Sequence, residues 1–154
     1  MERPAGFDIV QRPKHYNNHP SGVECIEIIE HMTFNLGNAF KYLWRGGLKS
    51  KDATQDYEKA LWYVLRDDER RPAYIPTPRS IEIFRAAMLT DNRARRALAR
   101  PSPWCESVRC SLSFIIDSHC TSDLMELARL NERIVRCIKQ AISDGRCLGR
   151  GQEP

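Results

Sequence analysis

The stretch GNAFKYLWRGG, residues 37–47, has the spacing of an amphipathic helix that stops at two glycines. Successive helical residues are rotated by about 100°, so the polar side chains fall on one narrow stripe: Asn38, Lys41, Tyr42 and Arg45. The apolar side chains recur at the spacing of a face that packs on a core: Leu36, Ala39, Phe40, Leu43 and Trp44. We expect Gly46 and Gly47 to supply the positive φ angle that closes many helices.

The charges on this stripe raise a question about its surroundings. Lys41 and Arg45 stand one helical turn apart with no acidic residue between them. Like charges at this spacing repel by roughly 0.2–0.5 kcal/mol unless an anion lies across them. A carboxylate or a phosphate group would serve, and an ordinary solvated helix surface is the simpler alternative.

Length and composition describe a globular protein. The chain of 154 residues is long enough for one domain, or for a small domain with an extension. Its 42% hydrophobic and 29% charged residues are ordinary for a protein of this class. No run approaches the ~20 apolar residues of a membrane span, and the N-terminus lacks a signal-peptide pattern. We therefore expect no membrane partner and a cytoplasmic location.

A change of composition divides the chain near residue 72. The segment RRPAYIPTPRS, residues 70–80, contains several prolines and cannot continue a helix. Residues 1–72 are balanced in charge, whereas residues 73–154 carry the whole net charge of +4, almost entirely as Arg. We predict a helical domain at 1–72 and an Arg-rich helical extension at 73–154 that serves oligomerisation.

Helical patterns cover almost the whole chain, so the predicted fold class is all-α. Asp52 is placed to cap a second helix that runs to about residue 69, whose apolar face includes Leu65. This helix and the one at 36–46 are joined by a short link, which favours an antiparallel hairpin as the core of the first domain. Thr77 followed by Pro78 is a typical helix start.

The extension contains two further candidate helices. Residues 105–119 suit a helix, although their alternation leaves a strand open. Thr121 or Ser122 would cap a long last helix with a coiled-coil-like seam. Asn131 either lies on that seam and fixes the register of a helix contact or faces solvent. The seam residues are Leu124, Leu127, Ile134, Ile138 and Ala141.

The cysteine pattern gives no support to a metal site. None of the six cysteines forms a CxxC pair, and the expected compartment is reducing. We expect free, mostly buried thiols and no metal bound by them. These residues are Cys25, Cys105, Cys110, Cys120, Cys137 and Cys147.

Polar residues of the first domain are the candidates for function. In a cleft between two helices, cations can hold phosphate oxygens and aromatic rings can stack a base. Carboxylates there can bind Mg²⁺ or orient a nucleophile. The candidates are His15, Tyr16, Glu24, Asn38, Lys41, Tyr42, Arg45, Asp56 and Lys59.

The order of these residues resembles a known family. PKHY, GVECIEIIE, FNLGNAFKYLWRGGLKSK and DYEKALWY, within residues 13–66, resemble a small phage and prophage family of unknown function. Its best-known member is the atypical nucleotide kinase of T7-like coliphages. The resemblance implies a compact helical domain that handles deoxynucleoside monophosphates. It also implies phosphoryl transfer from a nucleoside triphosphate, with Mg²⁺ bridging the phosphates, in the host cytoplasm.

The phosphate-binding loop of ordinary kinases is missing. RGGLKSK, residues 45–51, contains glycines, Lys and Ser but does not have the Walker spacing. Catalysis would therefore rest on the positioning of side chains and on charge neutralisation. We assign Lys41, Arg45 and Lys59 as phosphate ligands, His15 and Asn38 as positioning groups, Tyr16 or Tyr42 as the stacking ring, and Glu24 and Asp56 as catalytic or metal partners.

Three functions stay open on the sequence. The first is a nucleotide kinase without a P-loop, and the second is a protein that sequesters a nucleotide or a nucleotide-derived signal without catalysis. The third is a nucleic-acid-binding or oligomerising accessory protein, based on the Arg-rich extension, although a net charge of +4 is modest for that role. We also expect a homo-oligomer, because few helices per domain are available to enclose a pocket.

Overall fold

The computed structural model describes residues 22–46, 48, 52–70, 75–86, 93–99 and 104–148. Within these ranges the backbone forms seven α-helices and no strand, so the predicted all-α fold is confirmed. None of the described helices combines the length and apolarity that a bilayer span requires. The helices are α2 (Cys25–Ile29), α3 (Phe34–Arg45), α4 (Thr54–Glu69), α5 (Pro78–Arg85), α6 (Arg93–Leu98), α7 (Glu106–Ser118) and α8 (Leu124–Leu148).

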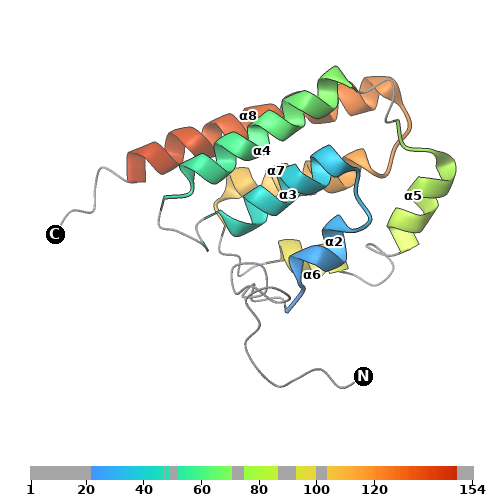
Figure 1. Cartoon of the computed structure of the whole chain (residues 1–154), viewed down its shortest axis with the longest axis horizontal. Helices are drawn as coiled ribbons and strands as arrows, with labels where there is room; N and C mark the ends of the chain where they lie inside the picture. The colour runs from blue at the N-terminus through green and yellow to red at the C-terminus, as the bar shows by residue number, and fades with distance from the viewer. Residues whose placement is uncertain are drawn as a thin grey trace.

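Four of these helices close on one another as a bundle. Helices α3 and α4 pack together as the predicted hairpin, and α7 and α8 form a second hairpin. Helix α4 also packs against α8, and α3 packs against α7, so each of the four has two neighbours (Figure 1). Helix α2 contacts α3, α6 contacts α7, and α5 stands to one side of the bundle (Figure 1).

The hydrophobic core continues across the composition change near residue 72. Trp44 of α3 is fully buried, and its ring packs on that of Trp104 with centroids 5.0 Å apart. The Trp104 indole N–H also donates to the Trp44 carbonyl oxygen over 3.0 Å. The same core cluster holds Phe40 before the boundary and Leu112 after it. Both hairpins therefore bury their apolar faces against each other, and the division at 72 stays a prediction.

Two predicted helix starts are confirmed. The Asp52 carboxylate accepts the Thr54 N–H over 2.8 Å at the beginning of α4. The Thr77 hydroxyl accepts the Ser80 N–H over 3.1 Å, with Pro78 as the first residue of α5. In both cases a short polar side chain satisfies a backbone donor that has no partner within the helix.

The reason for a glycine at position 46 differs from the prediction. Gly46 has a φ angle of −57°, so it does not adopt the expected left-handed conformation, while Gly47 lies outside the described residues. A Cβ atom at position 46 would overlap the ring of Tyr57, which is itself buried. Glycine is therefore required here because α4 places an aromatic ring against the end of α3.

The second hairpin corrects three predictions. Residues Glu106–Ser118 form α7, so the alternative of a strand is wrong. Asp123, and neither Thr121 nor Ser122, caps α8, since its carboxylate accepts the N–H groups of the next turn over 2.8 and 3.1 Å. Leu124 is 53% exposed and lies outside the buried seam.

The polar residue of the α8 seam is buried. Asn131 faces the interior together with Leu127 and Ile134, so the alternative in which it faces solvent is wrong. Its side-chain carbonyl oxygen is buried and has no hydrogen-bond partner.

On α4 one prediction about the core is wrong. Leu65, which was expected on the apolar face, is exposed.

Candidate functional site

The anion that lies across the charged stripe of α3 is a carboxylate of α4. Arg45 donates from Nε to Asp56 Oδ2 over 3.1 Å and from Nη2 to Asp56 Oδ1 over 2.8 Å. The two side chains are only 12% and 10% exposed. This two-pronged geometry holds the planar guanidinium in one orientation and ties α3 to α4.

Three cationic side chains gather around a single aromatic ring at this point. The distances to the Tyr42 ring centroid are 4.6 Å from the Arg45 guanidinium carbon, 5.1 Å from Lys41 Nζ and 5.7 Å from Lys59 Nζ. The Tyr42 ring also stacks on Tyr63 of α4, with centroids 5.8 Å apart and planes inclined by 19°. We call Lys41, Tyr42, Arg45 and Lys59 the cation cluster.

Amide oxygens are the hydrogen-bond partners of both lysines of the cation cluster. Lys41 Nζ donates to Asn38 Oδ1 over 2.8 Å, and Asn38 in turn donates to the Phe34 carbonyl oxygen over 2.8 Å. Lys59 Nζ donates to Gln55 Oε1 over 3.3 Å. Within the part of the chain that the structure describes, no carboxylate forms an ion pair with either ammonium group.

The environment of Lys41 opposes its positive charge. Burial lowers the pKa of Lys41 below its ordinary value, and the charge of Arg45 lowers it further. A negative charge placed beside Lys41 would act in the opposite direction, because it favours the protonated ammonium.

An aromatic pocket of about 340 Å³ adjoins the cation cluster through Tyr63. Sequence reasoning missed this pocket. The sequence does contain a signal for it, namely the position of Trp62. This aromatic residue falls outside the apolar face of its helix, where it would not pack on the core. The lining residues are Thr33, Phe34, Asn35, Trp62, Tyr63, Arg66, Asp67 and Arg70.

One predicted site residue has a helix-capping position in the structure. Glu24 is the N-cap residue of α2, and its backbone N–H donates to the Glu27 carboxylate over 2.9 Å in a capping box. His15 and Tyr16 lie outside the described residues. The structure therefore brings together Asn38, Lys41, Tyr42, Arg45, Asp56 and Lys59.

The described side chains do not build a cage for Mg²⁺. Among them, no three acidic, His or Cys groups converge in a way that could hold a metal ion. Both oxygens of Asp56 accept hydrogen bonds from Arg45. Asp56 is therefore engaged by Arg45, and the expected Mg²⁺ on the phosphate groups of a nucleotide stays a prediction.

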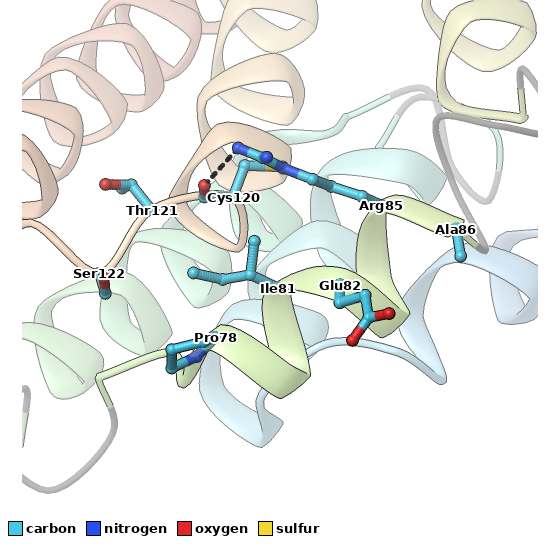
Figure 2. Close-up of a pocket in the computed structure, with 8 residues that line it drawn as sticks. All are labelled: Pro78, Ile81, Glu82, Arg85, Ala86, Cys120, Thr121 and Ser122. Atoms are coloured by element: carbon cyan, nitrogen blue, oxygen red, sulfur yellow. Dashed lines mark hydrogen bonds between the residues drawn. The ribbon is translucent and has the colours of Figure 1, made fainter.

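A second and larger hollow of about 660 Å³ lies between α5 and the turn that joins α7 to α8. Arg85, a basic residue of its lining, reaches across to the Cys120 carbonyl oxygen and donates to it over 2.9 Å (Figure 2). Among the residues that the structure describes, none of the predicted site residues lines this hollow. Arg85 holds α5 against the turn, so we assign the contact a structural role.

Comparison with known proteins identifies one region of similarity. Residues 10–65 match the model of a family described as a protein of unknown function, DUF3310. No curated protein and no solved structure matches the chain. The matched region covers α2, α3 and most of α4, and therefore the whole cation cluster. It agrees with the predicted resemblance to a family of unknown function over residues 13–66.

Proposed function

We propose that this chain binds a nucleotide and that Lys41 and Lys59 hold its phosphate groups beside the Tyr42 ring. The observation that carries the proposal is the pair of lysines that lack a described acidic partner, although each lies within 5.7 Å of the same ring centroid. A phosphate accepts several charge-assisted hydrogen bonds at once, which suits donors that converge from two helices. The predicted resemblance to a family whose best-known member is the nucleotide kinase of T7-like coliphages also favours this proposal.

Arg45 has a different part in this proposal from its predicted one. Its guanidinium already holds Asp56, so it contributes charge to the cation cluster and positions the neighbouring Tyr42 ring. Asn38 orients the Lys41 ammonium because its Oδ1 accepts a hydrogen bond from one of the three N–H groups. Two protons of that ammonium are then available for phosphate oxygens.

Calorimetry with inorganic tripolyphosphate and with the common deoxynucleoside triphosphates tests the proposal. Replacing Lys41 and Lys59 by Ala should weaken the binding of both kinds of ligand by about ten- to a hundredfold per lysine, since each charge-assisted bond contributes about 1.5–3 kcal/mol. Lys139→Ala is the matched control, because Lys139 is an exposed lysine of α8. Binding that is equal in the double variant and in wild type would refute the proposal.

Phosphoryl transfer is the second candidate function. The observation that favours it is the carboxylate of Asp56, which lies at the cation cluster through its bond to Arg45. Through Arg45, a carboxylate in that position could help orient the 5′-phosphate group of a deoxynucleoside monophosphate, whose oxygen attacks the γ-phosphorus of ATP while the bond to the leaving ADP breaks. A product assay with ATP, Mg²⁺ and dTMP or dGMP separates the candidates. Turnover that Asp56→Asn abolishes, with retained binding, would establish a kinase, and binding without turnover would establish a sequestering protein.

A further inference from the structure

Two of the most exposed large apolar side chains flank the aromatic pocket. Phe34 at the start of α3 is 76% exposed, and Trp62 on the outer side of α4 is 59% exposed. Fully burying such a side chain contributes about 1.5–3 kcal/mol, and neither residue gains that contribution from the fold. Both line the same hollow, so their exposure is concentrated at one place on the surface.

The aromatic pocket has the form of a slot, and its rings are arranged around Tyr63. Trp62 meets the Tyr63 ring edge-on, with centroids 4.9 Å apart and planes at 88°. Phe34, from the other helix, also meets Tyr63 edge-on, at 6.2 Å and 72°. The slot thus has aromatic walls from two helices, and its volume is at the lower end of the range of small-molecule sites, about 300–1,000 Å³.

Polar groups lie at the same slot. The Thr33 hydroxyl oxygen is buried and has no hydrogen-bond partner, although Thr33 lines the pocket. Asn35, Arg66 and Arg70 add amide and guanidinium groups to the lining. Aromatic walls with a few polar groups are the combination that binds a planar heterocycle by its faces and its edge.

We propose that this slot is the binding site for the base of a nucleotide, which stacks against Trp62 and Phe34. The inference rests on the proposed function, because it makes the slot and the cation cluster two parts of one site. Tyr63 connects them, since it lines the slot and stacks on Tyr42, the ring around which the cations gather. The class of ligand is a nucleobase that carries phosphate groups.

Affinity measurements with matched variants test the base site. Phe34→Ala and Trp62→Ala should each weaken the binding of a deoxynucleoside triphosphate by about tenfold or more and leave the binding of tripolyphosphate unchanged. Trp62→Phe should keep most of the affinity. Leu65→Ala is the control, because Leu65 is an exposed apolar residue of the same helix that does not line the slot.

Fluorescence gives a readout that a structural role would not change. Trp62 is the exposed tryptophan, whereas Trp44 and Trp104 are buried. A base stacked on Trp62 should quench tryptophan emission during titration with a deoxynucleoside triphosphate, and the quenching should be absent in Trp62→Phe. Thermal unfolding of each variant shows that it is folded, which we expect because both replaced rings are largely exposed.

The outcomes separate this inference from the proposed function. If tripolyphosphate binds as tightly as the triphosphates and Trp62 emission is unaffected, the base site is refuted while the phosphate site stands. If deoxynucleosides without phosphate quench Trp62 and tripolyphosphate does not bind, the base site stands and the phosphate site is refuted. Failure of all these ligands to bind refutes both.

Discussion

Breaking the Arg45–Asp56 pair should cost much of the stability of the fold. Asp56→Ala leaves the Arg45 guanidinium in its largely buried position without the carboxylate that accepts two hydrogen bonds from it. Removing one partner of a buried ion pair typically destabilises a protein by about 3–5 kcal/mol. Because 1 kcal/mol corresponds to ~2–4 °C in a domain of this size, the melting temperature should fall by roughly 10 °C.

The double variant Arg45→Met/Asp56→Leu should recover much of this loss, because it buries no unpaired charge. Urea unfolding followed by circular dichroism, on wild type, Arg45→Met, Asp56→Leu and the double variant, gives the coupling energy of the pair, which we expect to be about 2 kcal/mol. A cost below about 1 kcal/mol for Asp56→Ala, which is the range of exposed ion pairs, would refute the reasoning. The reasoning would also be refuted if the changes in unfolding free energy of the two single variants simply added up in the double variant.

Three further predictions concern other parts of the fold. Gly46→Ala should destabilise by about 1–3 kcal/mol because its Cβ displaces the Tyr57 ring, and a smaller residue at 57 should restore stability in thermal unfolding. Asn131→Leu should raise stability by about 1 kcal/mol or more, since it removes a buried oxygen without a partner; unchanged urea unfolding would contradict this. Burial lowers the pKa of His119, so on acidification the unfolded chain takes up a proton before the folded chain does. The contribution of neutral His119 to the free energy of unfolding should therefore be fully present above pH 6.5 and should fall as the pH drops toward the folded-state pKa. His119→Gln should flatten that acid-side decrease in pH-dependent unfolding curves.

The neutral form of His119 has a structural reason that the sequence does not reveal. Its Nε2 accepts the Thr33 N–H over 3.0 Å, and its Nδ1 lies 2.9 Å from the Ile115 carbonyl oxygen. The ring therefore carries its proton on Nδ1 and connects the end of α7 to the start of α3. Thr33 and His119 lie 86 residues apart in sequence, so no local pattern could have predicted their contact.

Local chemistry explains what the sequence predicted well. The helices, the Asp52 cap and the Thr77-Pro78 start depend on residues within one or two turns of each other, so periodicity and capping preferences are sufficient. The polar stripe of α3 was also correct, because spacing alone decides which residues share a helix face. Leu124 was misplaced because its spacing matches the seam although the residue lies at the open end of α8.

Contacts between helices were decided only by the tertiary structure. The sequence determined an all-α chain with cations on one stripe of α3, but not that Asp56 would neutralise Arg45 while the lysines keep amide partners. It placed Gly46 at the end of a helix, but the requirement for glycine comes from the Tyr57 ring of the next helix. The physical reason is the same in each case: periodicity fixes which side chains share a face, and packing fixes which face of another helix lies opposite.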